Sequence, residues 1–274
     1  MKGVLLEIRD CEQSMQTGQP SHPIRHPMCP PPKAPVDWGR FRAVLFDLDG
    51  VITQSARIHA AAWKETFDDF LARHSKTTGA PFAPFDIYRD YTRHVDGLPR
   101  RDGIRAFLKS RGLSLAEGNP DAPATSDTIA GLANRKNAAF HRILERDGIS
   151  LYQDAQVLLR GVEAHGCRTG LITSSRNCAA VLAAAGLTGR FDVEVDGVLA
   201  ARLILAGKPA PDTFLEAARR LGVTPSEAAL VEDSIAGIEA ASAGGFALVI
   251  AVDRAGIAAE LRAAGSDLVV DDLA

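Results

Sequence analysis

The sequence predicts an α/β protein with a doubly wound, Rossmann-like parallel-sheet core and an inserted helical cap domain. Two observations predict this fold. After Asp154, short apolar runs alternate with helical stretches, which is typical of βαβ units in a parallel sheet. A further apolar run at residues 42–46 ends at Asp47, and residues 55–148 after it have a mostly helical pattern. The simplest arrangement inserts these helical residues into the core directly after its first strand.

The expected strands are short apolar runs of the kind that a parallel sheet buries on both faces. They span residues 42–47, 169–173, 228–232, 246–252 and 267–270. The helices that should connect them lie near residues 155–165, 177–185, 211–221, 235–243 and 256–264. Within the inserted segment, the side chains that recur at helical spacing include His59, Trp63, Phe67 and Phe70.

These patterns divide the chain into three parts. Residues 1–38 are rich in proline and show neither a helical nor a strand period, so we expect a poorly ordered tail. Residues 39–54 and 150–274 are expected to form the α/β core, and residues 55–149 the helical cap.

Composition limits the classes of protein to which the chain can belong. With 46% apolar and 24% charged residues, it resembles an ordinary soluble globular protein. Its net charge of −3 provides no global attraction to nucleic acid or anionic lipid, so we expect neither as a partner. No apolar run approaches the roughly 20 residues that span a bilayer, and Glu7 interrupts the short apolar start. The four cysteines lack metal-binding spacing, which favours reduced thiols and a cytoplasmic protein, and we expect a monomer.

Two carboxylates, Asp47 and Asp49, follow the first expected strand. Ligands of open parallel sheets bind outside the carboxyl ends of the strands, and residues two apart in an extended chain point to the same side. Carboxylates this close repel each other unless a cation lies between them or one is protonated. Both conditions suit phosphoryl transfer, in which one carboxylate attacks phosphorus and the other carries a proton. Taken alone, the pair is equally compatible with a loop or a helix N-cap.

Further polar residues follow other expected strands. Glu232 and Asp233 supply oxygen ligands of the kind that Mg²⁺ binds. Thr173 and the serines after it precede a helix, where a hydroxyl and backbone N–H groups can hold a phosphate or simply cap the helix. Lys208, between glycine and proline, can neutralise phosphate charge, although an isolated lysine is more often a surface residue.

These residues resemble the four motifs of the haloacid dehalogenase superfamily, which occur here in order from about residue 40 onwards. The resemblance implies that Asp47 becomes an aspartyl-phosphate and that Asp49 is the general acid/base. Thr173 and Lys208 would then bind the transferring phosphate. The resemblance also implies a Mg²⁺ ion held by Asp47, the backbone carbonyl of Asp49 and Asp233, with Glu232 in support. Dehalogenating members lack the second aspartate, so Asp49 argues against dehalogenation.

Several segments further resemble the β-phosphoglucomutase family, among them residues 50–53, 97–102, 134–137 and 207–212. This resemblance implies a small sugar phosphate as substrate, β-D-glucose 1-phosphate, converted to glucose 6-phosphate through β-glucose 1,6-bisphosphate. Arg100 and Lys136 would hold the non-transferring phosphate, and His59 would position Asp49. The other substrate-binding residues implied are Trp63, Asn137, Ser174, Arg176 and Asn177. The sequence departs from the family pattern at Gln54, Ser55, Asp96 and Gly103.

Three functions remain open at this point. A phosphatase lets water attack the aspartyl-phosphate, whereas a mutase excludes water and needs a second phosphate site inside a closed cap. Arg100 and Lys136 favour the mutase. Both could instead be solvated charges on a helix face, and His59 a histidine of the apolar core. A non-catalytic sugar-phosphate-binding protein would require a lost motif, and all four motifs are present.

Overall fold

The computed structural model describes residues 36–274. The predicted tail therefore lies almost entirely outside the described residues, as do Cys11 and Cys29. Trp38, the last residue of the predicted tail, is 3% exposed and packs with Phe41 in the apolar core. The apolar core thus includes Trp38, which the sequence analysis places in the tail.

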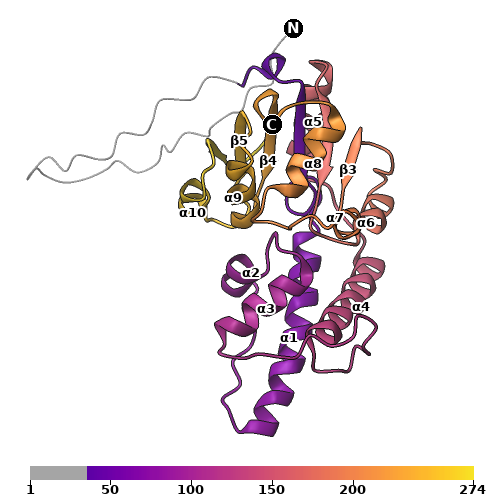
Figure 1. The fold of residues 1–274 in the computed structure, drawn as a ribbon, viewed down its shortest axis with the longest axis vertical. Coiled ribbons are helices and arrows are strands. Elements are labelled where there is room, and N and C mark those ends of the chain that lie inside the picture. Colours follow the sequence, from indigo (N-terminus) through magenta and orange to yellow (C-terminus); the bar gives the residue numbers. More distant parts are fainter. Residues whose placement is uncertain (1–35) are drawn as a thin grey trace, which may run out of the picture.

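The core of the molecule is a parallel sheet of six strands in the order β3-β2-β1-β4-β5-β6 (Figure 1). Its strands are β1 (Ala43–Asp47), β2 (Arg168–Ile172), β3 (Val193–Val195), β4 (Ala228–Glu232), β5 (Leu248–Val252) and β6 (Leu268–Val270). The chain runs outwards from β1 in one direction to β3 and then in the other to β6, so the order reverses between β1 and β4. Asp47 lies beside Ile172 of β2, and Phe46 lies beside Val231 of β4. This reversal, at the carboxyl ends of the strands, is where ligands bind in open α/β sheets.

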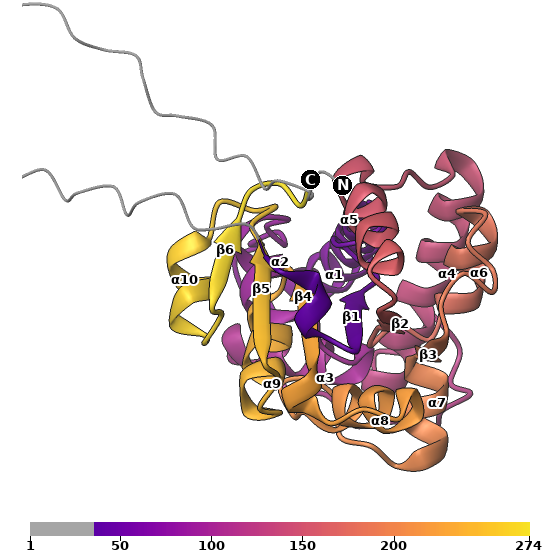
Figure 2. The same ribbon diagram turned by 90° about the horizontal axis from the view of Figure 1, so that it is seen from above.

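Helices cover both faces of the sheet. They are α5 (Gln153–Ala164), α6 (Cys178–Ala184), α7 (Gly197–Leu203), α8 (Asp212–Leu221), α9 (Ile235–Ala243) and α10 (Ala258–Ala263). Successive side chains of β1 point to opposite faces, so Val44 and Phe46 pack with α5 and α6 while Ala43 and Leu45 pack with α8 and α9. Figure 2 shows α5 on one side of the strands and α8 and α9 on the other. The doubly wound fold is confirmed.

A group of four helices lies beyond the carboxyl ends of the strands (Figure 1). They are α1 (Ala56–Thr78), α2 (Arg89–His94), α3 (Arg100–Ser110) and α4 (Ile129–Asp147). These helices bury an apolar cluster of their own, which includes Phe67, Phe85 and Phe107. Thr128 caps α4 by accepting the N–H of Gly131, and Gly79 ends α1 with a φ of 74°. We refer to this group as the cap.

The two segments that join the cap to the core run side by side. The N–H of Gln54 donates to Ser150 O (2.8 Å), and that of Tyr152 donates to Ile52 O (3.0 Å). Movement of the cap must therefore act on both segments together. Within residues 36–274, no helix combines the length and apolar character needed to cross a bilayer.

Most expected elements are present, and two were missed. β4 and α9 have the expected bounds, and the other expected strands and helices agree to within about two residues, as is usual at element ends. The prediction missed β3, a three-residue edge strand with no apolar run, and the short helix α7 that follows it. Within the cap, residues 79–88 and 111–128 are outside helices, so the helical pattern there is less continuous than expected.

Candidate active site

Asp47, the last residue of β1, lies at the centre of the site and is 5% exposed. Lys208 donates from Nζ to Asp47 Oδ1 (2.5 Å) and also to Glu232 Oε1. The N–H of Asp49 donates to Asp47 Oδ2 (2.7 Å). Burial, with the charges of Glu232 and Asp49, raises the pKa of Asp47 well above its ordinary value, although Lys208 opposes the shift. Asp47 therefore needs a further positive charge nearby to be an effective nucleophile.

Asp49 belongs to the turn after β1 and faces the same cavity. Its Oδ2 accepts a hydrogen bond from Thr173 Oγ1 (2.8 Å), and its Oδ1 accepts one from Ser55 Oγ. His59 Nε2 lies 3.2 Å from Asp49 Oδ1. Burial alone would raise the pKa of Asp49, but His59 and the two hydroxyl groups outweigh it and lower that pKa. Ser55, a departure from the family pattern, is thus one of the groups that fix the orientation of Asp49.

His59 and Lys136 continue this chain of contacts into the cap. Lys136 Nζ lies 2.6 Å from His59 Nδ1, and 5.1 and 4.9 Å from the ring centres of Trp63 and Phe140. An ammonium group only donates, so Nδ1 accepts and the ring hydrogen is on Nε2, which lies near Asp49 but has no hydrogen-bond partner among the described residues. Burial lowers the pKa of both side chains, with the charge of Lys136 as the next cause for His59 and that of Arg100 for Lys136. An anion bound in the cavity would therefore stabilise the charged form of Lys136.

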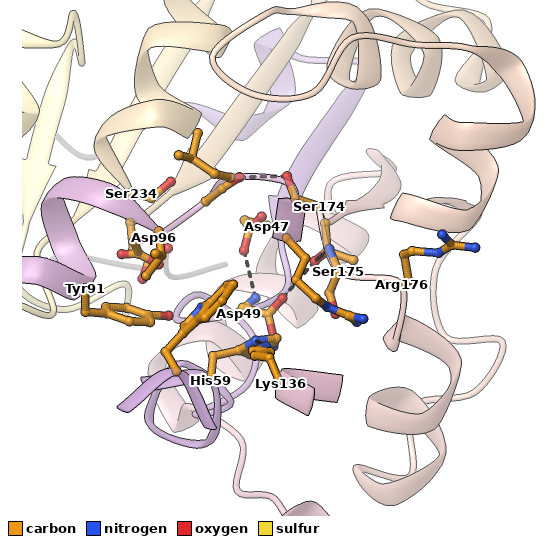
Figure 3. Close-up of a pocket in the computed structure, with 17 residues that line it drawn as sticks. Asp47, Asp49, His59, Tyr91, Asp96, Lys136, Ser174, Ser175, Arg176 and Ser234 are labelled. Atoms are coloured by element: carbon orange, nitrogen blue, oxygen red, sulfur yellow. Dashed lines mark hydrogen bonds and ion pairs between the residues drawn. The ribbon is translucent and has the colours of Figure 1, made fainter. Parts of the chain in front are cut away.

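Arg100, the first residue of α3, supplies a second cation from the cap. It donates to Asn137 Oδ1 (2.8 Å), and burial with the charge of Arg176 lowers its pKa to about 10. Asn137 thus holds Arg100 and does not itself line the cavity. Figure 3 shows the exposed side chain of Arg176 extending away from the aspartates, while Lys136 and His59 lie close to Asp49.

The segment after β2 provides hydrogen-bonding groups opposite the cap. Thr173 Oγ1 accepts the N–H of Ser175 (2.9 Å). Ser174, which we expect to bind substrate, lines the cavity and donates its hydroxyl hydrogen to Gly97 O (2.7 Å). Asn177 is 7% exposed, does not line the cavity, and its Nδ2 has no hydrogen-bond partner among the described residues.

The two acidic residues after β4, Glu232 and Asp233, have different contacts. Both oxygens of Glu232 are occupied, Oε1 by Lys208 and Oε2 by the N–H groups of Asp233 and Ser234. Glu232 therefore orients its neighbours, whereas Asp233 faces the cavity with Asp47. Burial and neighbouring carboxylates, Asp96 first, raise the pKa of Asp233 well above its ordinary value.

A divalent cation fits this arrangement of charge. The main chain leaves room for the carboxylate of Asp233 only because Gly50 has no side chain, since a Cβ there would lie 1.7 Å from Asp233 Oδ2. No group of three or more Asp, Glu, His or Cys side chains in residues 36–274 is arranged to hold an ion by itself. Asp47 and Asp233 would therefore supply two carboxylates, and Mg²⁺ would take its remaining oxygens from main chain, water and substrate.

Tyr91 and Asp96 line the cavity but were not among the predicted site residues. Asp96 is one of the departures from the family pattern. Figure 3 places both on the side of the cavity opposite Ser174 and Ser175. Burial and the charge of Glu232 raise the pKa of Asp96 to about 7, and Tyr91 forms a hydrogen bond with it. Their place in the site depends on how α2 and the residues after it pack on the core, and the spacing of residues in the sequence does not predict such a contact.

Comparisons with known proteins agree with this geometry. The haloacid dehalogenase-like hydrolase family matches residues 41–245. A beta-phosphoglucomutase from Mycobacterium bovis is 46% identical over 238 residues, which cover 86% of this chain and 91% of that protein. The solved structure of a beta-phosphoglucomutase from Clostridium difficile, 24% identical, shares the fold with a TM-score of 0.64 over 85% of this chain and 92% of that chain. A CbbY from Rhodobacter sphaeroides, solved in complex with phosphate, is 25% identical, with a TM-score of 0.61 and coverage of 85% and 95%.

The protein belongs to the haloacid dehalogenase-like hydrolase family, as the four motifs predicted. Within that family its similarity is to phosphoglucomutases, and it is an enzyme of the phosphomutase and phosphatase group.

Proposed function

We propose that the protein is a β-phosphoglucomutase that interconverts β-D-glucose 1-phosphate and glucose 6-phosphate through β-glucose 1,6-bisphosphate. The observation that carries this proposal is the pair of buried cations in the cap. Lys136 is 2% exposed, Arg100 is partly buried, and both line the same cavity as Asp47 and Asp49. A phosphatase needs one phosphate site beside its nucleophile, whereas a bisphosphate intermediate needs two. The relatives named beta-phosphoglucomutase support the same substrate.

In this mechanism Asp47 carries the phosphoryl group and Asp49 carries the proton. A sugar hydroxyl attacks the phosphorus of the aspartyl-phosphate, a new P–O bond forms, and the bond to the Asp47 carboxylate breaks. Asp49, held by Ser55, Thr173 and His59, accepts the hydroxyl proton. The sugar bisphosphate then turns over in the cavity, and Asp47 attacks its other phosphate while Asp49 returns the proton to the departing oxygen.

The other groups neutralise charge and exclude water. We propose that Asp47, the carbonyl of Asp49 and Asp233 hold Mg²⁺, which neutralises the charge on phosphate oxygens. Lys208 and Thr173 contact the transferring phosphate, and Arg100 and Lys136 hold the other one. The cytoplasmic location and the monomeric state of the enzyme stay predictions.

A product assay separates the mutase from a phosphatase of small sugar or polyol phosphates. The enzyme is incubated with β-glucose 1-phosphate, Mg²⁺ and a trace of β-glucose 1,6-bisphosphate, and glucose 6-phosphate and free phosphate are measured together. Glucose 6-phosphate should form much faster than free phosphate. Free phosphate as the main product would establish the phosphatase. If neither product forms, the protein is a non-catalytic binding protein.

Lys136→Ala tests the second phosphate site directly. Mutase turnover should fall severely, while slow hydrolysis of a small phosphate ester remains, because such an ester has no second phosphate for Lys136 to bind. Equal loss of both activities would place Lys136 outside the second phosphate site.

A further inference from the structure

Arg254, which follows β5, contacts segments that are distant from it in the chain. Its guanidinium group donates from Nη2 to Asp154 Oδ2 (2.7 Å) and from Nε to Gly50 O (3.4 Å). A third hydrogen bond runs from Nη1 to Asp271 O (3.3 Å). The group also lies over the ring of Tyr152, with Cζ 4.0 Å from the ring centre. All three nitrogens and one face of the guanidinium group are therefore in contact with the protein.

The ion pair between Arg254 and Asp154 is shielded from water. Their side chains are 17% and 8% exposed, and Asp154 Oδ2 also accepts the N–H of Leu273 (3.0 Å). An exposed ion pair contributes little, because water screens it and its side chains move. A guanidinium group held at three nitrogens and stacked on a ring has a fixed orientation, which the flexible amino group of a lysine lacks. Arg254 is thus suited to fix the main chain that it contacts.

One of these contacts is with the turn that carries the two aspartates of the site. Gly50 has a φ of 96°, and glycine adopts many backbone conformations at little cost, so its neighbours must fix the one observed. Its N–H donates to Thr53 O (2.8 Å), and its O accepts from Arg254. The N–H of Gly50 and the carbonyl of Asp49, which we propose as a Mg²⁺ ligand, belong to one planar peptide group. Rotation at Gly50 would therefore move this carbonyl and close the space that Asp233 occupies.

The other contacts join Arg254 to the segment by which the chain returns from the cap to the core. Tyr152 and Asp154 lie at the start of α5, and the N–H of Tyr152 donates to Ile52 O. Arg254 does not itself line the cavity. It can therefore act on the site only through the residues that it holds in place.

We infer that Arg254 is a positioning residue for the Mg²⁺ site. By holding Gly50 O, it fixes the turn so that the carbonyl of Asp49 and the carboxylate of Asp233 reach the same ion. The inference rests on the proposed phosphoryl transfer through Asp47 and extends it to a residue outside the cavity. It applies equally to a mutase and to a phosphatase, since both would use the same ion.

The first test measures Mg²⁺ binding by calorimetry with no substrate present. Arg254→Met removes every donor of the side chain and should raise the dissociation constant for Mg²⁺ by about tenfold or more, the usual effect of losing a group that orients metal ligands. Arg190→Met is the matched control, because Arg190 also pairs with a carboxylate of α5, that of Glu163, and makes no contact with the turn. Its dissociation constant should stay near that of the wild type. An unchanged constant in Arg254→Met, or an equal rise in both variants, would overturn the inference.

The second test separates positioning from stability. Arg254→Lys keeps a positive charge for Asp154 but has neither the planar group nor the additional nitrogen that reaches Gly50. Its melting temperature should therefore be closer to that of the wild type than the melting temperature of Arg254→Met is. Its dissociation constant for Mg²⁺ should nevertheless stay raised by about tenfold. Recovery of the wild-type affinity in Arg254→Lys would show that the contact with Gly50 is unimportant and would refute the inference.

The third test follows the phosphorylation of Asp47 by acetyl phosphate. Arg254→Met should form the phosphoenzyme at about one tenth of the wild-type rate when Mg²⁺ is limiting, and at nearly the wild-type rate when Mg²⁺ is saturating, because excess ion compensates for a weaker site. A rate that stays low at saturating Mg²⁺ would show that Arg254 supports the fold rather than the Mg²⁺ site. If the wild type releases mainly free phosphate from sugar phosphates, the mutase proposal fails, and the comparison of Mg²⁺ affinities still decides the role of Arg254.

Discussion

At the scale of single residues, Lys136 places its amino group where water has little access. Its side chain is 2% exposed and lies against the rings of Trp63 and Phe140. The ring faces and His59 only partly replace lost hydration. The same desolvation that makes this lysine costly in the free enzyme makes it an effective partner for a phosphate.

Lys136→Met should stabilise the ligand-free protein by about 1 kcal/mol or more at pH 7, because an apolar side chain of similar length needs no hydration. Burial and Arg100 lower the pKa of Lys136 from 10.5, so the unfolded chain binds this proton more tightly than the folded protein. The free energy of unfolding of the wild type therefore rises as the pH rises towards 10.5. In urea unfolding, the difference in this free energy between Lys136→Met and the wild type should become smaller between pH 7 and pH 10.

Lys109→Met, at an exposed position on α3, is the matched control and should show no such narrowing. A wild type more stable than Lys136→Met at pH 7 would contradict the burial cost assigned to Lys136.

Asparagine substitutions of the two aspartates should affect different steps of phosphoryl transfer. Asp47→Asn removes the nucleophile and should abolish every phosphoryl-transfer activity. Asp49→Asn keeps the nucleophile, so acetyl phosphate, whose leaving group needs no proton, should still phosphorylate it, while transfer to a sugar hydroxyl is lost. Intact-protein mass spectrometry detects the phosphoenzyme. Phosphorylation of Asp47→Asn would show that another residue is the nucleophile.

At the scale of elements, the turn after β1 depends on one glycine. Gly50 has a φ of 96°, and the carboxylate of Asp233, which follows β4, lies where its side chain would be. Because β1 and β4 are neighbours in the sheet, the close approach of Gly50 brings Asp47 and Asp233 to one cavity.

Gly50→Ala should lower the free energy of unfolding by about 2 kcal/mol more than Gly148→Ala does, since both have positive φ but only the first also overlaps another residue. It should also weaken Mg²⁺ binding measured by calorimetry. Equal effects of the two substitutions on both stability and Mg²⁺ binding would show that the contact with Asp233 is unimportant.

The sequence predicted the elements that a local pattern of residues marks, and it missed those without such a pattern. β4 and α9 were predicted to the residue because an apolar run and the N-cap serine Ser234 mark them locally. β3 was missed because an edge strand of three residues buries little and carries Glu194 at its middle. The other three-residue edge strand, β6, was predicted because all three of its residues are apolar, whereas β3 has no such run.

The site shows the same division. Asp47, Asp49, Thr173 and Lys208 stand at strand ends or in a restricted loop, so sequence alone could single them out. The hydrogen bond from Ser174 to Gly97 depends on how the cap packs on the core. The presence of Tyr91 and Asp96 in the cavity depends on the same packing. Such contacts join residues distant in the chain and leave no period in the sequence.

At the scale of the whole molecule, the cap has a hydrophobic cluster of its own and also shares one with the core. The cap has its own apolar cluster, but Ile58 of α1 and Phe140 of α4 belong to the same buried cluster as Val44 and Phe46 of the sheet. His59 crosses from cap to core to reach Asp49. The contact of His59 with Asp49, the proposed proton carrier, therefore forms when the cap lies on the core, which is also the condition a mutase needs to keep water from the phosphoenzyme.

A single-turnover chase tests the central claim that Asp47 passes its phosphoryl group to a sugar rather than to water. The enzyme is phosphorylated with labelled acetyl phosphate, freed of excess donor, and mixed with saturating β-glucose 1-phosphate and Mg²⁺. Most of the label should appear in sugar phosphates, and the phosphoenzyme should decay far more slowly when the sugar is left out. Release of the label as free phosphate at the same rate with and without the sugar would contradict the account.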